Sequence, residues 1–316
     1  MNIEKILDHN NLRLNPYPVQ YPDLWDFLKK QRACVWFVEE IDLGKDYFDK
    51  LNENEKTFIK MILAFFSQFD GIVNLNITEH LLDKVKIIEA QHNYRWQMAM
   101  EDIHSDMYGL LIESYIKDND EKDKLRNAIS NFDVLNELKL WGEKWLLKNN
   151  FAIALLINAF IEGIFFSAPF CLIFFIAQDN KLPGLCKSNE FISRDEGMHT
   201  EFAVMMYNKL ENKLSKDQVQ EILREMLIIN EKFILQTLPC KLIGMSSEKM
   251  IQYVKFISDR LLHNLGYPKI FHIQENPLPF MDRIGLEAKN NFFESRTTEY
   301  QKSNSLKKKL DILETF

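Results

Sequence analysis

The sequence predicts an all-helical protein, built as one bundle of long helices. Glycine (10) and proline (9) make up only about 6% of the 316 residues, about half of their usual share, so few chain-breaking residues interrupt helices. Apolar residues recur with the helical period of 3.6 through most of the chain, and no strand pattern repeats. The 24 phenylalanines predict a large aromatic core.

The elements follow one another with few breaks. Residues 1–22 are expected to form an extended lead, because its three prolines oppose helix formation. Asn52 and Glu55 have the spacing of a capping box at a helix start, and Ser188 is the expected N-cap of a later helix. The helical domain should cover 23–300, before a flexible tail at 301–316. Its long helices are predicted at 51–82, 84–117, 133–149, 188–210, 216–238 and 246–265.

Residues 151–177 form a run that is long and apolar enough to span a membrane. However, Glu162 lies in its middle, Asn158 one turn earlier, and Pro169 interrupts its second half. A carboxylate in mid-membrane is costly and usually marks function. The run is therefore interpreted as the buried central helix of the bundle.

Charge, cysteine usage and the N-terminal sequence indicate which partners and which location to expect. The net charge of −7 and the pI near 5.6 give no reason to expect a nucleic-acid or anionic-membrane partner. The cysteines include no Cys-x-x-Cys pair, a pattern that fits a reducing compartment better than disulfides or a zinc site. The N-terminus lacks a signal-peptide pattern, so the expected location is cytoplasmic.

Glu-x-x-His occurs three times, and its arrangement indicates a metal site. A carboxylate in an apolar stretch precedes each of two pairs: Asp70 lies 31 residues before Glu101, and Glu162 lies 34 before Glu196. Bundles that bind two iron or manganese ions take one carboxylate from each of two helices and Glu-x-x-His from each of the other two. The pairs are Glu89/His92, Glu101/His104 and Glu196/His199.

The predicted fold class is therefore a ferritin-like helical bundle with a dimetal-carboxylate site in its four-helix core. Two divalent cations would neutralise four carboxylates that are otherwise costly to bury, and oxygen and imidazole ligands suit iron or manganese. The pair Glu89/His92 lies about 120° around the helix from Glu101, so it is assigned to the bundle exterior.

Tyr108 lies one turn beyond His104, on the same helical stripe as Glu101. A buried tyrosine is commonly a core residue whose hydroxyl is bonded to a neighbour. Beside a dimetal centre it is also a phenol that oxygen activation can oxidise to a radical. Such a radical persists only where apolar side chains exclude water and reductants. The candidates for these side chains are Phe165, Phe166, Phe170 and Ile192.

These residues lie in segments that resemble the small, radical-generating subunit of class I ribonucleotide reductase, in the form found in eukaryotes and large DNA viruses. The resemblance runs from about Trp25 to Tyr300. The segments that carry it are VWFVEEIDL (35–43), LAFFSQFDGIVN (63–74), AMEDIHSDMYGLLI (99–112), IEGIFFSAPF (161–170), NEFISRDEGMH (189–199), KLIGM (241–245), DRLL (259–262) and NNFFESRTTEY (290–300).

The resemblance implies a set of site residues. By position it places the radical on Tyr108 and the pocket around the radical at Phe166, Phe170 and Ile192. The implied radical-transfer residues are Trp36, Asp195 and Tyr300. The implied metal ligands are Asp70, Glu101, His104, Glu162, Glu196 and His199.

The resemblance also implies the activity and its requirements. Two iron ions, oxo-bridged when oxidised and with manganese as the alternative, would react with O₂ to form a tyrosyl radical. The radical would pass to a large subunit that reduces ribonucleotides to deoxyribonucleotides. The chain would form a homodimer and dock on the large subunit through LDILETF, from Leu310 to Phe316.

Two other functions stay open on the ligand pattern. A ferritin-like iron-handling protein would use the same ligands without exporting a radical, and would not need Trp36, Asp195 or Tyr300. A dimetal oxidase acting on a small molecule would need a substrate cavity beside the metals, where packed phenylalanines are expected.

Overall fold

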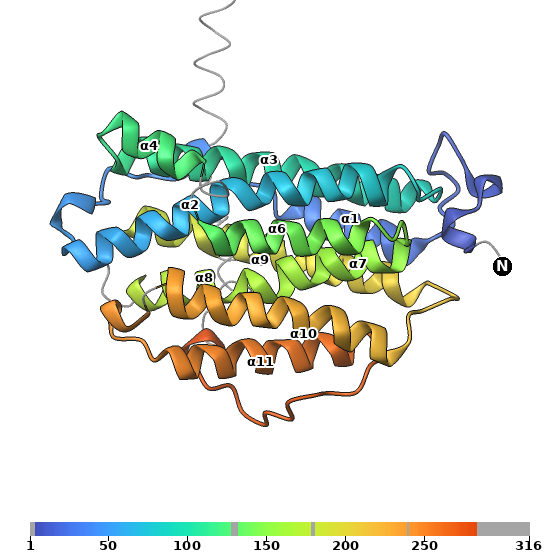
Figure 1. Ribbon diagram of the computed structural model, residues 1–316. Coiled ribbons are helices and arrows are strands. Elements are labelled where there is room, and N and C mark those ends of the chain that lie inside the picture. Colours follow the sequence, from blue (N-terminus) through green and yellow to red (C-terminus); the bar gives the residue numbers. More distant parts are fainter. Residues whose placement is uncertain (1–3, 128–131, 178–180, 239, 283–316) are drawn as a thin grey trace, which may run out of the picture. The chain divides into compact units, whose positions relative to one another are not determined.

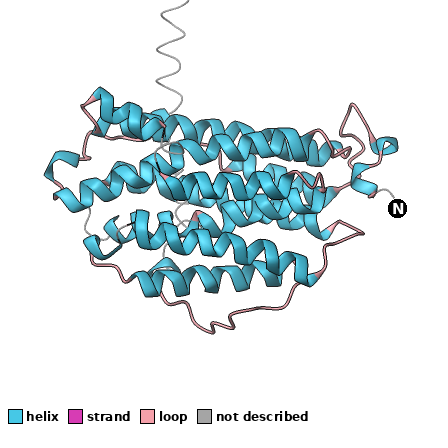
Figure 2. Cartoon of the chain, in the orientation of Figure 1, coloured by secondary structure: helices cyan, strands magenta, loops and turns pink. Residues whose placement is uncertain are grey.

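The structure, a computed structural model, describes residues 4–127, 132–177, 181–238 and 240–282. The chain divides into two compact units, residues 1–278 and 279–316. Of the second unit only 279–282 are described, and there the Asp282 amide donates to Pro279 O. Every regular element among the described residues is helical (Figure 2), so the all-helical prediction is confirmed.

The first unit consists of long helices lying side by side (Figure 1). Its centre is formed by α2, α3, α7 and α9, of which α2 packs on α3, α3 on α9, α9 on α7 and α7 on α2. The α-helices are α1 (Pro22–Ala33), α2 (Glu53–Asn76), α3 (Ile88–Tyr115), α4 (Asn119–Arg126), α6 (Asp133–Leu146), α7 (Phe151–Phe160), α8 (Ser167–Ala177), α9 (Pro183–Asn208), α10 (Lys216–Lys232) and α11 (Ser247–Asn264).

Three π-helical segments interrupt or extend these helices. They are Ile77–Leu82 after α2, Ile161–Phe165 between α7 and α8, and Phe233–Thr237 after α10. The middle segment carries Glu162. Because a π-turn adds a residue to the helical turn, it changes the direction in which the following side chains point. Such turns are frequent at functional sites.

The apolar run at 151–177 lies inside the bundle. Two helices, Glu53–Leu82 and Phe151–Ile176, have the length and composition of a membrane span, but 56% and 83% of their apolar windows are buried within the fold. A core helix passes that test as readily as a membrane helix does. The burial of Phe151–Ile176 agrees with its interpretation as the central helix.

The predicted helix starts are correct at one site and wrong at another. Asn52 Oδ1 accepts the Glu55 amide at 2.9 Å and Glu55 Oε2 accepts the Asn52 amide at 3.1 Å, so the capping box is confirmed. Ser188 is not an N-cap, because α9 begins at Pro183 and Ser188 is buried inside it. The first-turn amides of α9 are bound instead by Asp46, a residue far away in the sequence.

The assignment of Glu89 to the exterior is also wrong. Glu89 is 0% exposed, and Arg13 Nη2 lies 2.6 Å from both of its carboxylate oxygens. The Gln20 amide donates to it at 2.8 Å. This buried ion pair holds the N-terminal lead on α3, and the lead itself contains short 3₁₀ turns at Lys5–Leu7 and His9–Asn11.

Candidate metal centre

Four of the six predicted ligands meet in the core. Glu101 from α3, Glu162 from the π-segment, and Glu196 and His199 from α9 each offer one ligand atom, and these atoms lie within 4.8 Å of one another. Each of these residues is 3% exposed or less. The Glu-x-x-His spacing works as expected, because residues three apart share a helix face.

His104 belongs to the same cluster. Its Nδ1 lies 3.0 Å from Glu196 Oε1 and 3.2 Å from Glu101 Oε2. His199 Nδ1 lies 2.9 Å from the other oxygen of Glu101, Oε1. Both imidazoles therefore turn the same ring nitrogen toward the carboxylates.

Asp70 completes the predicted set from α2. It is 1% exposed, and its Oδ2 has no hydrogen-bond partner. Burial raises its pKa well above the ordinary value, and the charge of Glu101 raises it further. Asp70 thus lies in the electric field of the cluster, although it is outside the four residues whose ligand atoms are closest together.

Some buried polar atoms of the cluster form no normal hydrogen bond. Of the five such atoms, four lie 2.9–3.6 Å from a carboxylate oxygen or ring nitrogen of a neighbouring ligand. Asp70 Oδ2 has no partner, and leaving such a buried atom unmet costs about 1–3 kcal/mol, more when it is charged. Divalent cations would bind these oxygen and nitrogen atoms directly, so the residues present fit a pair of metal ions. The atoms are Asp70 Oδ2, Glu101 Oε1, Glu196 Oε1 and Oε2, and His199 Nδ1.

Burial and the neighbouring charges shift the pKa values of the clustered groups. Burial raises the pKa of Glu162 as it does that of Asp70. For His104 and His199, burial opposes the charged form, but the surrounding carboxylates outweigh it and raise the pKa. Burial likewise opposes ionisation of Glu101, but the two histidines hold its pKa at about 2.

Two amides fix the carboxylate of Glu162. Gln97 Nε2 donates to its Oε1 at 2.7 Å, and Asn158 Nδ2 donates to its Oε2 at 2.9 Å. Asn76 donates in turn to Asn158 Oδ1 at 3.3 Å. Gln97 was missed by the sequence analysis, although it lies four residues before Glu101 on α3 and hence on the same face.

Tyr108 is 0% exposed and its ring stacks on Phe66, with centroids 4.8 Å apart and planes at 5°. Phe66 also contacts two residues of the predicted pocket, Phe170 at 4.7 Å and Phe166 at 5.4 Å between centroids. The third pocket residue, Ile192, is buried on α9. Phe66 was missed, and its position four residues before Asp70 on α2 is the signal that could have found it.

A hydrogen-bonded chain runs from Trp36 to the cluster. Trp36 Nε1 donates to Asp195 Oδ2 at 2.8 Å, and the same oxygen lies 3.3 Å from His104 Nε2. Burial opposes the charge of Asp195, but its bonds to His104 and the charge of Arg194 lower its pKa. Arg194 donates to Asp195 Oδ1 at 2.8 Å and was not identified from sequence.

Three predicted residues fall outside the described part of the chain. They are Tyr300, Leu310 and Phe316.

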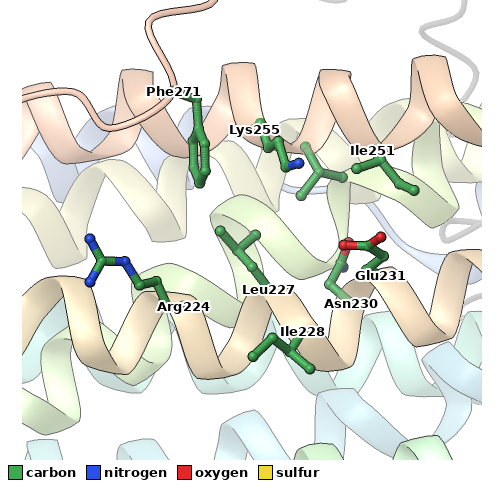
Figure 3. Close-up of a pocket in the computed structure, with 9 residues that line it drawn as sticks. Arg224, Leu227, Ile228, Asn230, Glu231, Ile251, Lys255 and Phe271 are labelled. Carbon is green, nitrogen blue, oxygen red and sulfur yellow. The ribbon is translucent and has the colours of Figure 1, made fainter.

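A cavity of about 240 Å³ lies elsewhere, between α10 and α11 (Figure 3). Leu227 and Ile228 line it from α10 and Ile251 from α11, while Phe271 closes one side. None of its lining residues belongs to the metal-ligand cluster. The ring of Tyr108 is instead covered by Phe66, on which Phe166 and Phe170 pack in turn.

The fold and the cluster together define a ferritin-like bundle of the dimetal-carboxylate class. Within that class, the chain belongs to the ribonucleotide reductase small-chain family: the family model described as "Ribonucleotide reductase, small chain" matches residues 13–277. The sequence resemblance is thereby confirmed. Members of this family bind a dimetal centre, and a buried glutamate–histidine cluster is present in this chain.

Individual relatives agree with this assignment. The ribonucleoside-diphosphate reductase small chain of Plasmodium falciparum (isolate Dd2) is 49% identical, over 98% of this chain and 89% of the relative. The small chain of Vaccinia virus (strain Ankara) is 45% identical, over 95% of each. Among solved structures, the Rnr4 homodimer of Saccharomyces cerevisiae superposes with a TM-score of 0.81 at 28% identity, covering 94% of this chain and 92% of that one.

Metal uptake should release protons. Because the pKa values of Asp70, Glu162, His104 and His199 are raised, these groups hold their protons to higher pH than free side chains do, and metal ions must displace the protons that they carry. Apparent affinity for Mn(II) should therefore rise with pH, about tenfold per unit for each proton displaced. Calorimetry of the metal-free protein in buffers of different ionisation enthalpy counts the protons.

The matched control is Asp259→Asn, which changes a buried carboxylate outside the cluster. It should release as many protons as the parent. Mn(II) binding without proton release in the parent would contradict the assigned protonation of the cluster.

Proposed function

We propose that this chain is the radical-generating small subunit of a ribonucleoside-diphosphate reductase, with Tyr108 as the site of its stable radical. One observation carries the proposal: in a chain of this family, a fully buried tyrosine lies in the field of a buried carboxylate–imidazole cluster and stacks on an aromatic ring. The products of the complete enzyme would be deoxyribonucleotides, the precursors of DNA.

The proposed cofactor is a pair of iron ions, with manganese as the alternative. The ligands would be Asp70, Glu101, His104, Glu162, Glu196 and His199, which together supply four carboxylates and two imidazoles. When bound in its reduced, divalent state, the metal pair would supply electrons that activate O₂ and thereby the oxidising power needed at Tyr108. Gln97 and Asn158 would hold the Glu162 carboxylate in one orientation through their amide hydrogen bonds, and such outer contacts tune metal ligands.

The surroundings of Tyr108 suit a radical. Burial, and next the charge of Asp70, raise the pKa of Tyr108 well above its ordinary value, so the side chain stays a neutral phenol. It must therefore lose its electron and its proton together. Phe66 stacks on the phenol ring, and Phe166 and Phe170 pack against Phe66, an aromatic cluster that would exclude water and external reductants.

The chain from Trp36 through Asp195 to His104 is the proposed export route. Trp36 and Asp195 are each 2% exposed, and Asp195 contacts the indole and the imidazole through one oxygen. Arg194 binds the other oxygen and keeps the carboxylate charged and oriented. Tyr300 would continue the route to the large subunit.

The partners proposed are a second copy of this chain and a large subunit. The yeast relative's structure is a homodimer, and the same assembly is proposed here, in the cytoplasm. The C-terminal segment from Leu310 to Phe316 combines apolar and acidic residues, a composition typical of a segment that orders on binding a partner.

The two other functions are not favoured. Iron handling without radical export has no use for the buried bond between Trp36 and Asp195. An oxidase acting on a small molecule needs space beside the centre, where Phe66 instead stacks on Tyr108 and packs against Phe170.

The first test is electron paramagnetic resonance after loading the metal-free protein with Fe(II) and admitting O₂. The parent should give a tyrosyl signal, and Tyr108→Phe should bind and oxidise iron without that signal, because it lacks the phenol. Oxidised iron without a radical in the parent, also after a repeat with manganese, would move the assignment to iron handling or an oxidase.

Trp36→Phe should keep the radical but lose ribonucleotide reduction with the large subunit, by about a hundredfold or more, the scale for a group that acts in the reaction. The phenyl ring retains the packing but has no N–H for Asp195. Trp141→Phe is the matched control, because Trp141 is buried on α6, outside the route, and should keep full turnover. Normal turnover by Trp36→Phe would eliminate the route.

Removing residues 310–316 should leave the radical signal intact and abolish turnover at ordinary concentrations of the large subunit, since the docking segment is lost. A synthetic peptide of LDILETF should inhibit the parent competitively with respect to this subunit. Leu306→Ala, an apolar change just before the segment, serves as the control. Unchanged affinity of the truncated chain in a sedimentation or surface-binding assay would refute docking through this segment.

A further inference from the structure

Asn189 is the hydrogen-bond partner of Tyr108 in the core. Its Oδ1 accepts the Tyr108 hydroxyl at 3.0 Å, and both side chains are 0% exposed. Asn189 is neither one of the predicted ligands nor part of the predicted pocket, although it lies three residues before Ile192 on α9. It is thus a polar group placed directly on the oxygen atom where the proposed radical would form.

The Asn189 amide is held in one orientation. Its Nδ2 donates to Leu185 O, one turn earlier in α9, at 2.8 Å, so Oδ1 is the atom left to face Tyr108. The Leu185 amide is itself bound by Asp46 Oδ2 at 2.9 Å, which fixes this end of α9. Reversing the side-chain amide would break the bond to Leu185 O, at a cost typical of a buried hydrogen bond.

This arrangement distinguishes the two oxidation states of Tyr108. A phenol has a proton to donate to the amide oxygen, whereas a phenoxyl radical has none and would set two acceptors against each other. The hydrogen bond therefore stabilises the phenol alone. An amide oxygen is also too weak a base to take the proton. Oxidation of Tyr108 would therefore require another proton acceptor, for which the carboxylates of the cluster are the candidates, and the bound metal pair would accept the electron.

We propose that Asn189 is a positioning residue that holds the Tyr108 hydroxyl and favours the phenol over the radical. The radical is then a stronger oxidant than it would be without Asn189, which helps its transfer to the partner. This inference rests on the proposed function. Its structural part, the hydrogen bond, exists without metal and can be tested separately.

The first measurement uses the metal-free protein. The infrared C–O stretch of ring-labelled tyrosine reports hydrogen bonding of the phenol, and Tyr108→Phe identifies which band belongs to Tyr108. Asn189→Leu should shift that band to the position of an unbonded phenol. Asn189→Asp, which keeps an acceptor oxygen at the same place, should leave it near the parent position.

The second measurement uses the protein loaded with metal and O₂. Asn189→Leu should shift the equilibrium between radical and phenol toward the radical, by about five- to tenfold against a redox mediator, since one net hydrogen bond is lost. Asn93→Leu is the control: it removes another fully buried asparagine of the bundle, bonded to Leu24 O and Glu89 O, and should change neither the band nor the equilibrium.

The outcomes are distinguishable. An unshifted band in Asn189→Leu would overturn the hydrogen bond and the proposal with it. A shifted band with an unchanged radical equilibrium would reduce Asn189 to a structural residue. A shifted band in a protein whose parent forms no radical would overturn the proposed function, and with it the tuning of a radical, while the hydrogen bond remained.

Discussion

The structure depends on one constraint, the concentration of carboxylates in an apolar core. Asp70, Glu101, Glu162 and Glu196 are all 3% exposed or less, and unpaired buried charges are among the costliest features that a fold can carry. In the metal-free protein, raised pKa values and two imidazoles offset the charge. Metal ions would replace those protons, which couples cofactor binding to the stability of the whole centre.

Polar groups around the cluster form hydrogen bonds to three of its parts: a ligand carboxylate, a ligand imidazole and the neighbouring tyrosine. Gln97 and Asn158 hold Glu162 on one side. Asp195 connects His104 to Trp36 on another. Asn189 contacts Tyr108, whose ring is covered by Phe66. Each contact is buried, so each acts in a medium of low dielectric where a hydrogen bond is strong and an unmet group is costly.

Regular helices alone would not bring these groups together. Glu162 lies in a π-turn between α7 and α8, and α9 starts where Asp46 binds its first amides. Gly184 allows that contact, since a Cβ atom there would lie 2.8 Å from both Asp42 O and Asp46 Oδ2. The position of Asn189, and of the ligands about two and three turns beyond it, thus depends on a loop more than a hundred residues earlier in the chain.

The sequence by itself determined the helical class, the capping box at Asn52 and the Glu-x-x-His pairs, because helical periodicity and spacing are local properties. Tertiary structure alone decided which groups meet. The sequence cannot show that Asp46 rather than Ser188 binds the first amides of α9. Nor can it show that Arg13 pairs with a buried Glu89, or that Phe66 and Asn189 contact Tyr108. Each of these contacts joins residues distant in the chain, and only the packing of helices against one another sets their distance and their burial.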